Sequence, residues 1–126
     1  MDKWNLRIMK SKRTKATDIS PKVRQKVYAR DKGCIFCQMG YRMDGECGIG
    51  QLQVAHFCAR SQAGLGIEEN LALVCIHHHQ MLDNSEHRAE MKEMFREYLK
   101  GIYPEWTEQK LKYDKWSWMN GTDDTI

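Results

Sequence analysis

Four metal-binding side chains stand within five residues of this sequence, because Cys75 is followed by one isoleucine and then by three consecutive histidines that end at His79. Neither helix propensity nor core packing favours three adjacent histidines. One close cysteine pair lies upstream, Cys34 and Cys37, and its two-residue spacer allows both thiolates to bind one tetrahedral zinc ion. Together the two half-sites predict a single structural zinc site, which ties distant parts of the chain to one point.

The spacing also predicts which side chains bind that zinc. A two-residue spacer after Cys75 reaches His78, so the expected ligands are one Cys₃His set: Cys34, Cys37, Cys75 and His78. A three-residue spacer to His79 is sterically possible as well, and Cys47 in the glycine-rich stretch 38–50 is an alternative ligand. The sequence therefore leaves open which of the two histidines binds the zinc.

Length and cysteine content favour one small domain in a reducing compartment. A chain of 126 residues buries a modest core, so a structural metal contributes materially to its stability. Five cysteines are an odd number, and the sequence shows neither a secretory leader nor an apolar run of about 18 residues. We therefore expect metal thiolates rather than disulfides, a cytoplasmic location and no membrane segment.

Positive charge is concentrated near the N-terminus. Residues 1–32 hold 11 of the 20 lysines and arginines beside three acidic residues, which leaves +8 there and −5 over the remainder of the chain. Residues 1–19 lack a sustained apolar period and are predicted to form a flexible basic arm. Lys10, Lys12 and Arg13 are its candidate contacts to nucleic-acid phosphates. The alternative is a solvated tail that only aids solubility.

Two short strands and a helix are predicted around the histidines. In residues 51–57, alternate apolar side chains share a face with His56, which is typical of a half-buried strand. Residues 58–66 have the polar and small side chains of a loop, and the apolar run 71–74 is expected to pair back as a second strand. A helix over 77–82 then carries the histidines.

Further helices are predicted on both sides of this hairpin. Ser20 and Pro21 form a favourable helix start, and residues 31–33 stop that helix. Beyond the histidines, a second helix is expected to end at Gly101 and to bury one apolar stripe: Met91, Met94, Phe95, Tyr98 and Leu99. A tail over 114–126 carries two tryptophans, which are expected to pack back on the domain.

Residues 20–84 carry a joint set of short motifs: Cys34-x-x-Cys37, Val54-Ala55-His56-Phe57, Arg60-Ser61, Gly64, Glu69-Asn70-Leu71 and Cys75-x-x-His78-His79. In this order they resemble an HNH endonuclease of the zinc-knuckle type that is common in phages and mobile elements. The resemblance implies an α+β fold, namely a small zinc-stabilised ββα-metal (His-Me finger) domain over residues 20–113 with flanking N- and C-terminal helices. It also implies metal-dependent hydrolysis of DNA phosphodiester bonds, by nicking or by double-strand cutting.

The site residues take their expected roles from that resemblance. His56 would be the general base, since a neutral imidazole accepts a proton from water near pH 7. His79 would hold a catalytic Mg²⁺ or another divalent ion such as Mn²⁺ or Ni²⁺. Asn70 would hold the loop or orient His56, and Arg60 would bind the scissile phosphate. The implied partner is duplex DNA, with a second copy of the chain or a phage or mobile-element protein as a further partner.

One position departs from the family pattern in a way that bears on activity. Many members carry Asp or His immediately before the first histidine as a ligand of the catalytic metal, whereas this chain has Ala55. Asp83 lies four residues beyond His79, on the same helical face, and could complete the site. The alternative function is a zinc module that binds nucleic acid or protein and is catalytically weak or silent.

Overall fold

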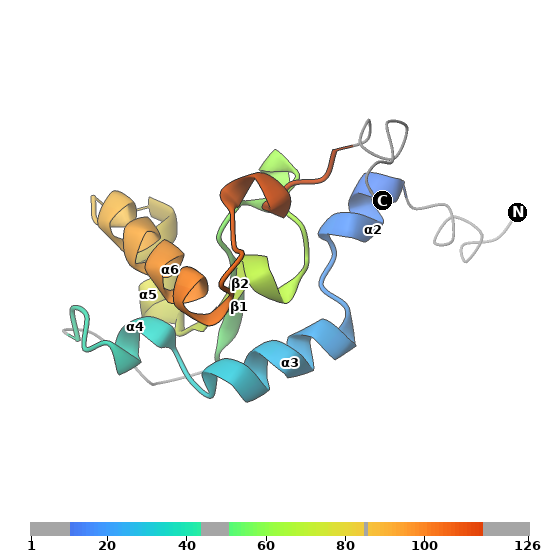
Figure 1. The fold of residues 1–126 in the computed structure, drawn as a ribbon. Coiled ribbons are helices and arrows are strands. Elements are labelled where there is room, and N and C mark those ends of the chain that lie inside the picture. Colours follow the sequence, from blue (N-terminus) through green and yellow to red (C-terminus); the bar gives the residue numbers. More distant parts are fainter. Residues whose placement is uncertain (1–10, 44–50, 85, 115–126) are drawn as a thin grey trace, which may run out of the picture.

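The computed structural model describes residues 11–43, 51–84 and 86–114 and gives them a small α+β fold, in which helices surround a two-stranded antiparallel sheet (Figure 1). In chain order the helices and strands are α2 (Lys12–Thr17), α3 (Pro21–Asp31), α4 (Ile35–Gln38), β1 (Gln53–His56), β2 (Leu71–Val74), α5 (Ile76–Asn84) and α6 (Arg88–Ile102). Short 3₁₀ helices cover Arg60–Gln62, Glu68–Asn70 and Glu108–Leu111.

The sheet is one antiparallel pair of four-residue strands. Gln53 lies opposite Val74 at one end, and His56 lies opposite Leu71 at the other. β2 has the bounds that the sequence predicts and is buried along its whole length. β1 is shorter than the predicted strand over 51–57, because a strand extends only as far as its partner can pair with it.

Helices cover both faces of the sheet. On one face, Leu71 and Leu73 pack together with Val27 of α3. On the other face, Ala55 and Ala72 belong to the main core, which also contains one large side chain from each of three helices: Phe36, Leu82 and Phe95. Because side chains alternate along a strand, His56 shares its face with Leu71 and not with Ala55.

The first predicted helix has the expected ends. Ser20 caps α3 by accepting a hydrogen bond from the Val23 backbone N–H at 3.1 Å, and Pro21 occupies the first turn. The helix ends at Asp31, and the C-cap Lys32 adopts a left-handed conformation with φ of 66° and donates its backbone N–H to the Tyr28 carbonyl. Both ends of α3 are therefore set by local capping contacts.

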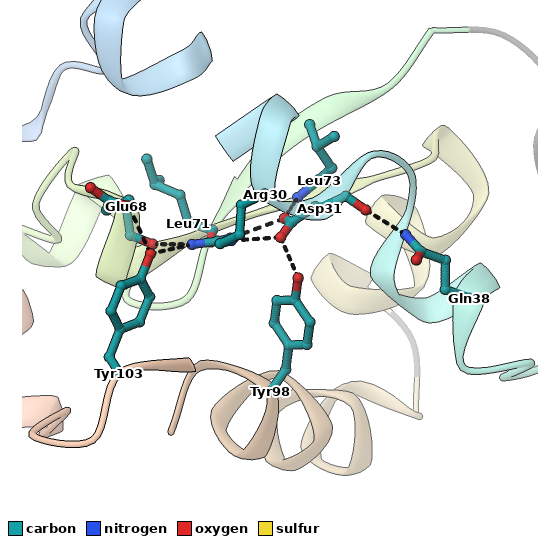
Figure 2. Close-up of polar contacts among 8 residues, drawn as sticks. All are labelled: Arg30, Asp31, Gln38, Glu68, Leu71, Leu73, Tyr98 and Tyr103. Atoms are coloured by element: carbon teal, nitrogen blue, oxygen red, sulfur yellow. Dashed lines mark hydrogen bonds and ion pairs between the residues drawn. The ribbon is translucent and has the colours of Figure 1, made fainter. Parts of the chain in front are cut away.

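A buried ion pair stands at the C-terminal end of α3 (Figure 2). Arg30 Nε and Asp31 Oδ1 lie 2.6 Å apart, and the Asp31 side chain is 0% exposed. Asp31 Oδ1 also accepts the hydroxyl of Tyr98, and Oδ2 accepts the backbone N–H of Leu73 at 2.8 Å. This one carboxylate therefore joins α3, β2 and α6.

Arg30 makes the matching contacts on its other side. Its Nη1 donates to the Glu68 carbonyl at 2.8 Å and to the Tyr103 hydroxyl at 3.0 Å, while Nη2 donates to the Leu71 carbonyl at 2.5 Å. Burial, reinforced by the Asp31 carboxylate, raises the pKa of Tyr98 to about 12 and so favours the protonated hydroxyl that donates to Asp31. In the sequence, Asp31 is recognisable only as part of a helix stop.

The expected flexible arm is partly helical. Residues 12–17 form α2, whose N-cap Ser11 accepts the Thr14 backbone N–H at 3.0 Å. Thr17 at its end is 4% exposed, and the Gly66 backbone N–H donates to the Ala16 carbonyl at 2.9 Å. Apolar periodicity missed this helix because a cap and backbone contacts, rather than an apolar stripe, hold it. Lys10 lies outside the described residues.

α6 buries three of the five residues of the predicted stripe, leaves Met94 and Tyr98 half-buried, and continues past its predicted end. Met91, Phe95 and Leu99 are fully buried, and the helix runs through Gly101 to Ile102. A helical glycine costs only about 1 kcal/mol relative to alanine, so the packed stripe outweighs it. The two tail tryptophans lie outside the described residues. Within the described ranges, no helix is both long enough and apolar enough to span a membrane.

Candidate functional site

The structure brings the four predicted zinc ligands together: Cys34, Cys37, Cys75 and His78. Their ligand atoms all lie within 4.8 Å of one another. The Nδ1 atom of His78 is 3.6, 3.5 and 3.3 Å from the sulfurs of Cys34, Cys37 and Cys75, and the last two sulfurs are 3.8 Å apart. Among the described residues this is the one group of three or more histidine, cysteine or acidic side chains that converges on a point.

These distances fit a tetrahedral metal ion. With zinc–sulfur bonds of about 2.3 Å and zinc–nitrogen bonds of about 2.0 Å, tetrahedral angles place two sulfurs about 3.8 Å apart and a sulfur and a nitrogen about 3.5 Å apart. The observed separations of 3.8 Å and 3.3 to 3.6 Å match this geometry. Three thiolates and one imidazole prefer a soft or borderline cation, so the group could hold a metal such as zinc.

The two half-sites share one local conformation. Cys34 precedes α4 and its sulfur accepts the Cys37 backbone N–H at 3.4 Å. Cys75 precedes α5 and its sulfur accepts the His78 backbone N–H, also at 3.4 Å. Each cysteine therefore caps a helical turn that presents the second ligand three residues later. The two-residue spacer in the sequence predicts this arrangement.

Contacts around the group fix the tautomer of its histidine, and burial favours the neutral thiol form of its cysteines. His78 is 0% exposed, and its Nε2 lies 2.6 Å from the Tyr41 carbonyl, which selects the tautomer that leaves Nδ1 as the ligand. Burial raises the pKa of Cys34 and of Cys37, and the neighbouring thiols raise that of Cys37 further. A cation at the centre would oppose this shift of the cysteine pKa by stabilising the thiolates.

The structure decides between the histidines that the sequence left open. His78 belongs to the metal group, whereas His79 points to a different part of the surface and lies between Gln53 and Asp83. One step along an α-helix turns the side chain by about 100°, which separates the two neighbours. The alternative ligand Cys47 lies outside the described residues.

His56 and His79 meet in a cleft of about 240 Å³ between the end of β1, α5 and the start of α6. The polar side chains that line it come from four segments of the chain: His56, Arg60, Gln62, His79, Asp83, Arg88 and Lys92. A proton acceptor, a histidine–carboxylate pair and three cations thus share one small concave surface.

His56 has the properties of a neutral base. It is the last residue of β1, and its Nε2 lies 3.4 Å from the Thr17 carbonyl. Burial lowers the pKa of His56; Arg60 and His79 add to the effect, and the Thr17 carbonyl opposes it. The imidazole therefore carries a lone pair at pH 7 that can accept a proton.

His79 and Asp83 form a pair on one face of α5. His79 Nδ1 lies 2.5 Å from Oε1 of Gln53, which leaves Nε2 directed at the Asp83 carboxylate at 3.8 Å. Neighbouring ligands of an octahedral Mg²⁺ lie about 3.0 Å apart. At 3.8 Å the two atoms of this pair lie farther apart than that, and the Asp83 side chain is 62% exposed.

Asn70 holds the loop between the strands. It is 0% exposed; its Oδ1 accepts the Cys58 backbone N–H at 2.8 Å, and its Nδ2 donates to the carbonyls of Cys58 and Leu65 at 3.1 and 2.8 Å. The loop is so tight that a Cβ on Gly64 would lie 1.7 Å from the Cys58 carbonyl oxygen. Of the two roles that the resemblance implies, these contacts correspond to holding the loop.

Cations of the cleft come from two regions. Arg60 forms an ion pair with Asp18 at 2.5 Å, and about half of its side chain is exposed. Arg88 and Lys92, which no sequence motif marks as site residues, line the cleft from α6. Lys92 donates to the Phe57 carbonyl, and burial lowers its pKa. Arg88 and Lys92 are four residues apart and therefore share one face of α6, but no local sequence pattern relates that face to His56.

Comparison of the chain with protein-family models, with curated proteins and with solved structures finds no match.

Proposed function

We propose that the protein is a metal-dependent endonuclease of the HNH type, which hydrolyses phosphodiester bonds of DNA. The observation that carries the proposal is the cleft in which His56 stands with His79, Asp83 and three cationic side chains. It is supported by the order of elements, in which two antiparallel strands and a helix follow the first cysteine pair, and by the Cys₃His group that could hold a structural zinc.

In this function the chain supplies a base and a set of phosphate contacts. His56 takes a proton from the attacking water, because its imidazole is neutral at pH 7. Arg60 and Arg88 bind the non-bridging phosphate oxygens, and Lys92 adds positive charge at the cleft wall. A divalent cation, when bound by His79 and Asp83, supplies further positive charge that positions the phosphate and stabilises the leaving oxygen.

The Cys₃His group has a separate, structural part in the proposal. Cys75 immediately precedes α5, and His78 lies in the first turn of that helix, next to His79. A zinc ion that joins this turn to α4 therefore fixes the direction in which His79 points. The two metal sites would lie on adjacent residues but have different ligands: sulfur and nitrogen in one, nitrogen and oxygen in the other.

The departure at Ala55 also has a structural counterpart. Ala55 is 2% exposed and packs in the core opposite Ala72, on the face away from His56. The residue before the base therefore has no ligand atom to offer, and the carboxylate nearest to His79 is that of Asp83. We expect Asp83→Asn to raise the Mg²⁺ concentration that half-maximal cleavage needs.

The proposal predicts that His56→Ala lowers cleavage of supercoiled plasmid at least about 100-fold, which is the usual contribution of a general base. The measurement is the rate of nicking with Mg²⁺ or Mn²⁺, compared with the rate in EDTA. His87→Ala is the matched control, because this histidine pairs with Glu86 at the start of α6 and lies outside the cleft.

The alternative function is a zinc module that binds DNA without cleaving it, and the same experiments would reveal it. A zinc module that only binds would retard DNA in a gel equally well with and without His56 and would never convert supercoiled plasmid. Metal-independent nicking that survives in His56→Ala would likewise contradict it, because it would come from another nuclease in the sample.

The N-terminal cations are expected to bind the DNA backbone. If Lys3, Arg7 and Lys10 each contact one phosphate, replacing all three with glutamine makes the slope of log affinity against log salt shallower by up to about 3, at roughly 0.9 per contact. The titration is made on one duplex in the His56→Ala background. Replacing Lys22, Lys100 and Lys110 is the control of equal charge, and an equal change in both variants would indicate a tail that only aids solubility.

A further inference from the structure

Residues 11–19, here called the strap, lie beside the loop that follows β1, where they touch two of the proposed site residues (Figure 1). The Thr17 carbonyl is 3.4 Å from Nε2 of His56, and the Asp18 carboxylate is 2.5 Å from Arg60. Thr17 ends α2, so its carbonyl has no partner within the helix and is available to an outside donor. The strap thus contacts the proposed base and a proposed phosphate ligand at adjacent positions.

Tight packing locks the strap in this place. The Gly66 backbone N–H donates to the Ala16 carbonyl at 2.9 Å, and Arg13 donates to the Ser61 carbonyl at 3.1 Å. A Cβ built on Gly66 would lie 2.0 Å from the Asp18 carbonyl oxygen, which is closer than any two such atoms can approach. Position 66 therefore admits no side chain while the strap is docked.

The contact with Thr17 has a chemical consequence for His56. A carbonyl can only accept, so the imidazole must carry its proton on Nε2, and the lone pair resides on Nδ1. When the imidazole gains a second proton, the same carbonyl stabilises the cation that forms. A carboxylate behind a catalytic histidine has this effect in serine hydrolases, and a carbonyl has it to a lesser degree.

The strap lies behind the base and does not cover it. The residues that line the cleft come from β1, the loop after it, α5 and α6, and no residue of the strap is among them. Docking of the strap therefore leaves the cleft open to a phosphate. The strap is therefore placed as a positioning element. A segment that blocked the cleft would have to line it.

We propose that the strap is a positioning element of the site: the Thr17 carbonyl fixes the tautomer of His56, and the Asp18 carboxylate orients Arg60. The inference rests on the proposed nuclease function for its effect on catalysis. It gives the N-terminal segment a task other than phosphate binding, since Thr17 and Asp18 act through His56 and Arg60 and touch no DNA.

The test is Gly66→Ala in the full-length, zinc-loaded protein, because the added methyl group displaces the strap and the variant keeps every proposed site residue in its sequence. We expect single-turnover cleavage of supercoiled plasmid with Mg²⁺ to fall about 100-fold with little change in KM, as happens when a catalytic group is misplaced by about 1 Å. Gly101→Ala is the matched control, since a Cβ there meets nothing within 4 Å.

A second readout does not depend on cleavage. Nitrogen NMR of the histidine rings is expected to show His56 with its proton on Nε2 in the wild-type protein, and a mixture of tautomers in Gly66→Ala. A wild-type protein with the proton on Nδ1 would overturn the inference, even if Gly66→Ala did not fold. Cleavage at the wild-type rate by a folded Gly66→Ala variant would also overturn it. Cleavage faster than that of the wild-type protein would overturn it too, and would indicate that the docked strap blocks the cleft.

The two readouts also separate this inference from the proposed function. A wild-type protein that never cleaves, but shows His56 protonated on Nε2, would overturn the nuclease proposal and keep the contact between strap and imidazole. If the wild-type protein cleaves in a His56-dependent manner and Gly66→Ala cleaves equally well, the nuclease proposal stands and the role of the strap is overturned.

Discussion

Removal of the metal is expected to unfold this protein. Structural zinc in a set of cysteines and histidine contributes an apparent 10–16 kcal/mol, at about pH 7, to small domains whose total stability is about 5–15 kcal/mol. Here the ligands join α4 to α5 across 38 to 44 residues of chain, and His78 is fully buried. We expect one zinc per chain by elemental analysis and the loss of the thermal unfolding transition after chelation.

Cysteine substitutions test the same prediction residue by residue. Cys34→Ser should abolish stoichiometric zinc and lower the melting temperature far more than Cys58→Ser. The two cysteines make a matched pair, because each is 5% exposed and only Cys34 belongs to the metal group. Less than half an equivalent of zinc in the wild-type protein, or equal melting temperatures for the two variants, would contradict the assignment.

Asp31→Ala is expected to lower the free energy of unfolding by about 3–5 kcal/mol, because it leaves the mostly buried Arg30 guanidinium without its counter-charge. The substitution also removes the acceptor of the Leu73 backbone N–H and of the Tyr98 hydroxyl. The measurement is urea unfolding of the zinc-loaded protein. Because the network joins three elements, the loss should be seen as one cooperative transition at lower urea.

Tyr98→Phe provides the graded control for this network. It removes a single hydrogen bond to Asp31 and keeps the ring, so we expect a loss of about 1 kcal/mol. The prediction requires the aspartate variant to lose at least twice as much stability as the tyrosine variant. Equal losses would mean that the ion pair contributes little beyond that one hydrogen bond.

Sequence spacing by itself determined the parts of this protein that depend on local geometry. The two-residue spacers after Cys34 and Cys75 placed both half-sites, because a helical turn capped by a cysteine sulfur presents its next ligand three residues later. Ser20 and Pro21 set the start of α3, and the apolar run 71–74 set β2. These features are decided within a few residues, where propensity and capping act.

Only the tertiary structure decided which distant residues meet. Asp83, Arg88 and Lys92 were brought beside His56 by the packing of α5 and α6, and no period in the sequence relates those helices to the end of β1. Leu73 and Tyr98, which donate to the Asp31 carboxylate, lie 42 and 67 residues from it, and Thr17 and His56 lie 39 residues apart. Such pairs depend on how buried surfaces fit together, and this fit is a property of the whole chain and not of any short segment of it.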